Sequence, residues 1–249
     1  MSRDTSQPAP QRQPRRATWA VPILAYHRVG EPRRDHVPNV TPDAFRRQLR
    51  WVNRLGFQIE DFGNLAARIG RGESISRRTV VVTFDDGYEE TYSIVAPILR
   101  QLGCSATVFV TPKEVGQTGF LSWQQIRSIA RDGVTIGSHT MHHTYLPLVP
   151  IKQAEAELRD SKQCIEQELQ QPTDWLSYPI GGYTPEIQEI AKAAGYRGAC
   201  TTNRGLQRQG YDLFALRRIK MTERDRNPVS LWVKLTGHYD AFRRLERPS

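Results

Sequence analysis

The sequence has no long apolar run and very little cysteine. Across 249 residues with a mean hydropathy of −0.57, no stretch approaches the roughly 20 apolar residues that a membrane-spanning helix needs, which excludes a transmembrane protein. The three cysteines, Cys104, Cys164 and Cys200, are odd in number and form no CxxC pair. A disulfide framework and a thiolate zinc site are therefore not indicated. We expect three reduced cysteines that pack in the interior.

The N-terminal region lacks the roughly 7 to 15 apolar residues that form the core of a signal peptide. Its apolar run, residues 21–25, is short and is interrupted by Pro22. Because no export signal is visible, we expect a cytoplasmic location. Residues 1–18 are rich in proline, glutamine, serine and arginine. We expect them to form a disordered tail, followed by a single domain over residues 19–249.

Positive charge is unevenly distributed along the chain. The net charge is +9, and residues 197–249 alone carry a net charge of +7. A nucleic-acid-binding protein combines such a cluster with a known binding motif, and we find none, so no nucleic-acid partner is expected. A solvated basic face, or attraction to acidic glycan or membrane surfaces, is favoured. The alternative, DNA binding, would depend steeply on salt concentration. The sequence does not indicate an oligomeric state.

Short β-rich segments alternate with helical patterns, which is typical of βα units around a parallel sheet. Helices are predicted where capping residues precede apolar residues at helical spacing, and one more follows Trp123. Seven strands suggest a closed or nearly closed α/β barrel, in which polar residues directly after a strand are the candidates for chemistry. The predicted strands are 21–26, 79–84, 106–110, 134–137, 175–178, 196–201 and 215–219, and the capped helices are 41–56, 88–102, 151–169, 184–195 and 227–243.

Two adjacent carboxylates end one predicted strand. Asp85 and Asp86 follow the apolar segment 79–84 directly and precede Gly87. Aspartate and glycine are also common in turns, so this triplet alone does not establish a functional site.

Three histidines follow the predicted strand 134–137 within five residues. His139 and His143 are four positions apart, so one turn of helix-like backbone would place both rings on one side, while His142 would point elsewhere. Two imidazoles and one carboxylate form a His₂Asp set. A catalytic zinc site has three such protein ligands and an open position for water.

A metal held in this way would suit hydrolysis of an amide or ester. It lowers the pKa of its water toward about 7 and polarises a carbonyl oxygen. One of the two aspartates can bind the metal while the other removes the water proton, since the cation keeps the second carboxylate ionised. We expect a divalent ion, zinc first, with cobalt or nickel as alternatives.

Two motifs resemble those of the polysaccharide deacetylases with a NodB homology domain, also called carbohydrate esterase family 4. Thr83-Phe-Asp-Asp-Gly87 resembles the family's TFDDG, and Ser138-His-Thr-Met-His-His143 resembles its H(S/T)xxH. The resemblance extends over residues 21 to about 220 and implies a distorted (β/α)₇-type barrel. It also implies that Asp85 is the catalytic base and that Asp86, His139 and His143 hold the metal.

The third motif departs from the common pattern. Tyr178-Pro-Ile-Gly-Gly-Tyr183 resembles the YPYG of the branch that acts on exopolysaccharides such as poly-N-acetylglucosamine, and Ser177 stands where many members carry an arginine. The resemblance implies that Tyr178, Pro179 and Ile180 border the substrate and that the Ile180 N–H helps to hold the oxyanion. Trp123 is a candidate for stacking on a sugar ring, with a core position as the alternative.

The general acid also departs from the pattern, because the C-terminal strand 213–220 contains no histidine. Leu24-Ala-Tyr-His27 resembles the YH motif of the exopolysaccharide branch, which implies that His27 protonates the leaving amine. Its alternative role is a buried histidine bonded to backbone. His238, on a predicted surface helix, is the weaker candidate.

The sequence therefore predicts a metal-dependent hydrolase that removes N-acetyl groups from an N-acetylated glycan. Peptidoglycan, chitin oligomers, an O-acetyl ester and a small amide remain alternative substrates for the same chemistry. A non-catalytic glycan-binding protein on the same fold is the alternative from another class. Glycan substrates usually lie outside the membrane, and family members are commonly exported, which conflicts with the expected cytoplasmic location.

Overall fold

The computed structural model describes residues 21–32, 37–202 and 212–236. The expected disordered tail and His238 lie outside these ranges. The strands are β1 (Ile23–Tyr26), β2 (Arg28–Val29), β3 (Asn39–Val40), β4 (Gln58–Glu60), β5 (Thr79–Phe84), β6 (Thr107–Val110), β7 (Thr135–Ser138), β8 (Trp175–Ser177), β9 (Gly198–Thr201), β10 (Leu216–Arg217) and β11 (Ile219–Lys220). The α-helices are α1 (Pro42–Arg54), α2 (Phe62–Gly70), α3 (Ala96–Leu102), α4 (Trp123–Arg131), α5 (Ile151–Leu169), α6 (Pro185–Ala193) and α7 (Pro228–Leu235). Short turns are the π-helical η1 (Thr91–Val95) and the 3₁₀ helices η2 (Leu146–Leu148), η3 (Pro179–Gly181) and η4 (Glu223–Arg226).

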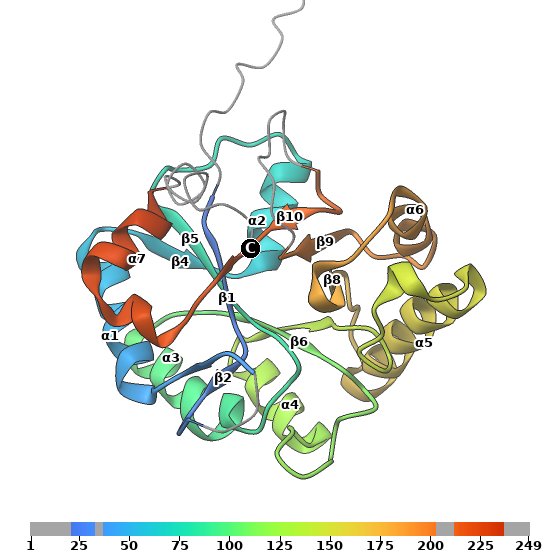
Figure 1. Ribbon diagram of the computed structural model, residues 1–249, viewed down its shortest axis with the longest axis horizontal. Helices are drawn as coiled ribbons and strands as arrows, with labels where there is room; N and C mark the ends of the chain where they lie inside the picture. The colour runs from blue at the N-terminus through green and yellow to red at the C-terminus, as the bar shows by residue number, and fades with distance from the viewer. Residues whose placement is uncertain (1–20, 33–36, 203–211, 237–249) are drawn as a thin grey trace, which may run out of the picture.

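The main sheet is parallel and runs in the order β10-β9-β8-β7-β6-β5-β1-β11, with β4 also paired to β5. Its two ends meet, because β10 and β11 are separated by Arg218 alone. Residues 216–220 thus pair with β9 on one side and with β1 on the other. The sheet is a nearly closed barrel with helices around it, as predicted (Figure 1).

Apolar side chains fill both faces of this sheet, as expected for strands that are covered on two sides. One buried cluster contains residues from β1, β5, β6, β8, β9 and β10, with Phe62 packed edge-on against Phe109 and Trp175. A larger cluster joins β1, β5 and β6 to α1, α3, α4 and α7, and a third joins β8 and β9 to α5 and α6. The carboxyl ends of the strands are thereby held at one mouth of the barrel.

The predicted strands and helices agree with the structure at most positions. Helix α5 spans the predicted residues, and the predicted strand 215–219 is split around Arg218 into β10 and β11. The predicted helix over 88–102 is confirmed from Glu90 onward, but it is not a regular α-helix. Pro97 has no N–H to bond the carbonyl four residues earlier, and the preceding turn widens into η1. Strand β4 and helix α2 were not predicted.

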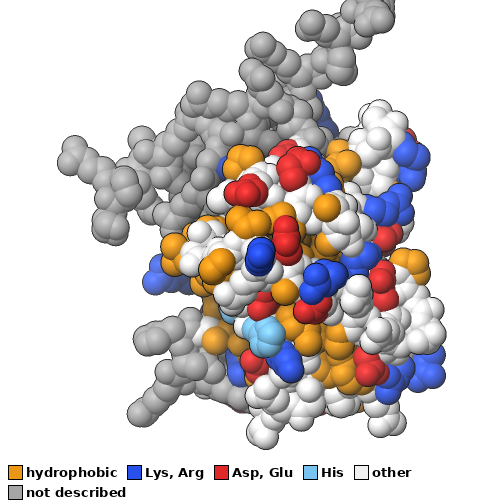
Figure 2. Space-filling view, turned by 90° about the vertical axis from the view of Figure 1, so that its right-hand side faces the viewer, with side chains coloured by type: hydrophobic (Ala, Val, Ile, Leu, Met, Phe, Trp, Pro, Cys, Tyr) orange, Lys and Arg blue, Asp and Glu red, His pale blue; other side chains and the backbone are white. Residues whose placement is uncertain are grey.

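The surface and the cysteines agree in part with expectation. No helix in the described ranges is long and apolar enough to cross a membrane. All three cysteines are free, but only Cys200 is fully buried, and Cys104 and Cys164 are partly exposed. On the face over α5 and α6, acidic and basic side chains are interspersed and do not gather by sign (Figure 2).

Candidate functional site

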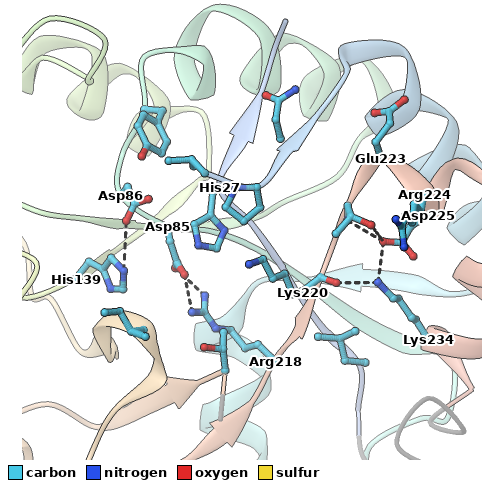
Figure 3. Close-up of a pocket in the computed structure, with 18 of the residues that line it drawn as sticks. His27, Asp85, Asp86, His139, Arg218, Lys220, Glu223, Arg224, Asp225 and Lys234 are labelled. Carbon is cyan, nitrogen blue, oxygen red and sulfur yellow. Dashed lines mark hydrogen bonds and ion pairs between the residues drawn. The ribbon is translucent and has the colours of Figure 1, made fainter. Parts of the chain in front are cut away.

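The turn after β5 sends its two carboxylates in different directions. Strand β5 is buried along its whole length and ends at Phe84, and the N–H of the next residue, Asp85, donates to the Tyr26 carbonyl on β1. Asp86 then adopts a left-handed φ of 71° and Gly87 a φ of 78°. A Cβ at Gly87 would lie 3.2 Å from Val110 Cγ1. Glycine is therefore required here by conformation and by space, and the turn separates the surroundings of Asp85 from those of Asp86 (Figure 3).

Asp86 faces two histidines in the arrangement of a metal site. Its Oδ1 lies 3.5 Å from His139 Nε2 and 3.4 Å from His143 Nε2, and the three ligand atoms all lie within 4.8 Å of one another. Within the described residues Asp86 Oδ1 is a buried oxygen with no hydrogen-bond partner. A buried acceptor without a donor is costly. One carboxylate oxygen and two imidazole nitrogens that converge in this way fit a divalent cation with nitrogen and oxygen preference.

A backbone carbonyl orients the first of these histidines. His139 Nδ1 lies 2.7 Å from the Ser177 carbonyl oxygen at the end of β8, and the ring is buried. Because the carbonyl can only accept, Nδ1 carries the proton and Nε2 presents its lone pair to Asp86. Burial lowers the pKa of His139 against the opposing effect of the nearby aspartates. A neutral imidazole is the form that binds metal.

The histidine loop is not helical, so the expected turn of helix-like backbone was wrong. Thr140 and His143 have left-handed φ values of 65° and 58°. The Thr140 N–H donates to Ser138 Oγ, and the Thr144 N–H donates to Thr140 Oγ1. These side-chain acceptors replace helical hydrogen bonds and turn both ligand rings toward Asp86.

His142 points away from the site, as predicted. Its Nδ1 lies 2.7 Å from Glu157 Oε1 on α5, and its N–H donates to Glu157 Oε2. The group of converging ligand atoms does not include it. His142 thus fastens the histidine loop to α5.

Asp85 is held by Arg218, to which the sequence motifs assign no role. Arg218 donates from Nη1 to Asp85 Oδ1 at 2.7 Å and from Nη2 to Oδ2 at 2.6 Å, and both side chains are buried. The same guanidinium donates to Thr83 Oγ1 and to Ser177 Oγ. Burial raises the pKa of Asp85, but the charge of Arg218 outweighs it, and the net pKa lies well below the usual range for a carboxyl group.

Arg218 supplies a guanidinium at the position where the third motif lacks its arginine. Ser177 occupies the position where many members carry that arginine. Its hydroxyl accepts a hydrogen bond from the guanidinium of Arg218, which lies between β10 and β11. A signal for this existed in the sequence. Two arginines lie within the apolar strand Leu216-Arg-Arg-Ile219, and a charge in a buried strand needs a partner.

His27 follows β1 and borders the same cleft as Asp85. Burial lowers the pKa of His27, partly offset by the negative charges of Asp85 and Asp86. Its Nδ1 is buried and has no hydrogen-bond partner among the described residues. The alternative role predicted for it, a buried histidine bonded to backbone, is not supported by the hydrogen bonds between described residues.

The cleft around these residues has a volume of about 1480 Å³, and its walls agree in part with those expected. Tyr178 and Ile180 line it, and Ile180 is 69% exposed with a left-handed φ of 58°. Pro179 is buried in η3. Trp123 packs against the apolar core and does not line the cleft. An aromatic wall is formed by Tyr88, which was also a sequence candidate for contact with a sugar, and by Phe120, and their rings stack with centroids 5.0 Å apart.

Comparison with known proteins agrees with this geometry. The family model described as polysaccharide deacetylase matches residues 72–199. The Bacillus subtilis (strain 168) protein YxkH is 30% identical over 202 residues, which cover 81% of this chain and 71% of that protein. The poly-β-1,6-N-acetyl-D-glucosamine N-deacetylase of Escherichia coli (strain K12) is 29% identical over 139 residues, 49% of this chain and 21% of that enzyme.

The fold agrees as well. The solved structure of the Streptococcus pyogenes deacetylase PplD in complex with acetate superimposes with a TM-score of 0.79 at 26% identity, covering 86% of this chain and 97% of that one. The nearly closed barrel is thus the NodB-like deacetylase fold, and the E. coli match is consistent with the exopolysaccharide branch. The chain belongs to the polysaccharide deacetylase family, whose members are metal-dependent hydrolases that cleave amide C–N bonds in glycans.

Proposed function

We propose that this protein is a metal-dependent N-deacetylase that releases acetate from an oligosaccharide or polysaccharide of N-acetylated sugars. The observation that carries the proposal is the unpartnered Asp86 Oδ1 between two imidazole nitrogens, next to a second carboxylate that is held apart from it. Zinc is the proposed metal, with cobalt or nickel as alternatives, because the donor set is one oxygen and two nitrogens.

The chain's own residues divide the chemistry. A divalent ion bound by Asp86, His139 and His143 would lower the pKa of a water molecule and polarise the acetamide oxygen. Asp85 accepts the proton of the attacking water, since Arg218 keeps this carboxylate ionised. The Ile180 N–H donates to the developing oxyanion.

His27 completes the reaction by delivering a proton to the nitrogen as acetate leaves. Its position supports this role, because it borders the cleft beside Asp85 and its Nδ1 is not engaged by any described residue. General acids of this kind contribute about 10² to 10⁴ in rate. The product is a glycan with a free amino group.

The test is acetate release after metal removal and reloading. Protein stripped with a chelator is reloaded with zinc or cobalt and assayed on poly-N-acetylglucosamine, chitin oligomers, peptidoglycan and an O-acetylated glycan. We expect release only with metal, and the substrate that gives the highest kcat/KM identifies the glycan. Asp85→Asn is the matched control, because it should bind metal without releasing acetate. If the loaded wild-type protein releases no acetate from any of these glycans, a non-catalytic glycan-binding role replaces the proposal.

A further inference from the structure

One wall of the cleft carries cationic side chains that no described residue pairs. This wall, called here the C-terminal wall, is formed by residues 217–234 and includes Arg217, Lys220 and Arg224. None of these three side chains takes part in an ion pair or side-chain hydrogen bond between described residues. The wall therefore offers three cationic side chains to whatever enters the cleft.

The carboxylates of the same wall are already engaged. Asp225 accepts from Lys234 Nζ at 2.7 Å, from Ser230 Oγ and from the Thr222 N–H, and it is buried. Glu223 accepts from the N–H and the hydroxyl of Thr41 at the start of α1. Neither carboxylate neutralises the cations, so the wall presents net positive charge.

Lys220 is the cation nearest to the chemistry by its position in the sheet. It is paired in register with Ala25 on β1, two residues before His27, and it lies two residues after Arg218 on the closing strand. Side chains two apart on a strand share a face. Arg218, Lys220 and His27 thus face the same mouth of the barrel, and Figure 3 shows the Lys220 ammonium pointing toward His27.

The backbone of Lys220 is fixed while its side chain is exposed. The Lys220 carbonyl accepts from Lys234 Nζ at 2.8 Å, and the adjacent Met221 N–H donates to the Ala25 carbonyl. The ammonium is therefore presented from a rigid strand into a cleft that already holds the Arg218 guanidinium. The positive charge of Lys220 contributes to the lowered pKa of His27, after burial and together with Arg218, which places the ammonium within electrostatic range of the proposed acid.

Cations gathered along one wall of a cleft, where the carboxylates of that wall are already engaged, favour an anionic ligand. A neutral polymer gains nothing from this wall beyond hydrogen bonds, and a sugar that already carries a free ammonium is repelled. One compact ammonium beside the reacting centre matches a single negative charge. Resting on the proposed function, we propose that Lys220, with Arg224 beyond it, selects N-acetylated glycans that carry a carboxylate close to the acetamide being hydrolysed.

The experiment compares two substrates that differ only in charge. The zinc-loaded protein is assayed on an oligosaccharide that alternates N-acetylglucosamine with glucuronate, and on the same oligosaccharide after its carboxylates have been reduced to alcohols. We expect kcat/KM to be about tenfold higher for the acidic form at low salt, because hydrogen bonds to a charged group are stronger than those between neutral groups. The preference should shrink as salt is added.

Lys220→Met is the informative variant, and Lys152→Met on the exposed face of α5 is its matched control. The ratio of kcat/KM for acidic to reduced substrate should fall toward 1 in the first and stay at the wild-type value in the second. Should Lys220→Met fail to fold by circular dichroism, Arg224→Gln and the salt dependence of the wild-type ratio give the same answer.

The outcomes separate the two proposals. Acetate release from both substrates with equal kcat/KM overturns the anion subsite and leaves the deacetylase proposal standing. An acidic preference that Lys220→Met and Arg224→Gln do not change also overturns the assignment of these residues. No release from either substrate, nor from the glycan panel above, is a failure of the proposed function itself.

Discussion

The surroundings of Asp85 and Asp86 differ although the two residues are adjacent in the chain. Asp85 is 2% exposed, and both of its oxygens accept from one guanidinium. Asp86 is partly exposed and faces two imidazoles at distances too long for hydrogen bonds. The protein satisfies one carboxylate internally and leaves the other for an external cation.

This difference shows how one turn can supply both a base and a metal ligand on the proposed mechanism. A carboxylate that is fully paired keeps its charge but is a weak base, so it takes protons only from an acidic donor such as water activated by a metal. Asp86 Oδ1, which has no hydrogen-bond partner among the described residues, gains most from a cation. The left-handed Asp86 and Gly87 are what keep the two environments apart.

The largest expected effects on activity and metal affinity come from replacing these two carboxylates one at a time. Asp85→Asn should lower kcat by about 10² to 10⁴ and leave metal bound, because it removes the base and no ligand. Asp86→Asn should weaken metal binding by more than the roughly 10- to 100-fold that loss of a second-shell partner causes. Calorimetric titration with zinc, run beside acetate assays, distinguishes them, and equal metal affinities in the two variants would contradict the assignment.

His27→Ala tests whether His27, and neither Asp85 nor Asp86, is the general acid. The variant should lose about 10² to 10⁴ in kcat while it binds zinc as the wild type does, because no ligand atom is changed. Steady-state kinetics and metal content measured on one preparation give the answer. Loss of metal in this variant would place His27 among the ligands and overturn its role.

Arg218→Gln removes the partner that makes Asp85 different from Asp86. It leaves a buried carboxylate unpaired, and such losses destabilise by about 3 to 5 kcal/mol. Urea unfolding at pH 7 measures this decrease. The pKa of Asp85 should also rise, which moves the acid limb of the pH–activity profile to higher pH.

The sign of the stability effect is fixed by linkage. In the wild type the pKa of Asp85 is depressed on folding, so its contribution to stability is present above the ordinary carboxyl pKa of about 3.9 and is lost as the pH falls toward the depressed value. Arg218→Gln should therefore cost stability at pH 7 and much less near pH 2. A loss that is the same at both values would show that packing, not charge, is responsible.

The smallest effect is expected for His142→Ala. This side chain bonds Glu157 at the far side of the histidine loop, so zinc affinity and acetate release should change by less than about twofold. His143→Ala, one residue along, is the contrasting variant and should lose metal. Comparable losses in the two variants would mean that the loop, rather than a ligand atom, controls the site.

Sequence reasoning found the parts of the site that lie in one segment. Asp85 with Asp86 and His139 with His143 each follow a buried strand, so the strand pattern and the residue types together place them. Arg218 was missed because its partner Asp85 lies 133 positions away, and no local pattern reports such a pairing. The non-helical histidine loop was missed because its shape depends on side-chain acceptors such as Ser138 and Glu157.

Trp123 and Phe120 illustrate the same limit in the walls of the cleft. Both are aromatic and lie three positions apart, and composition cannot decide which one faces substrate. Trp123 begins α4 and turns into the core, whereas Phe120 pairs with Tyr88 through an isolated bridge and stays at the cleft. Tertiary contacts between the turn after β5 and the segment before α4 determine which of the two rings lies at the cleft.

The strand segment 216–220 closes the barrel and is the last part of the sheet to be synthesised. Synthesis proceeds from the N-terminus, so β5, β7 and the histidine loop exist before Leu216–Lys220. Until that strand inserts between β9 and β1, Asp85 has no guanidinium and the ring of strands is open. A nascent or C-terminally nicked molecule without this strand would keep Asp86, His139 and His143 but lack the guanidinium that holds Asp85, so on the proposed mechanism hydrolysis requires the complete barrel.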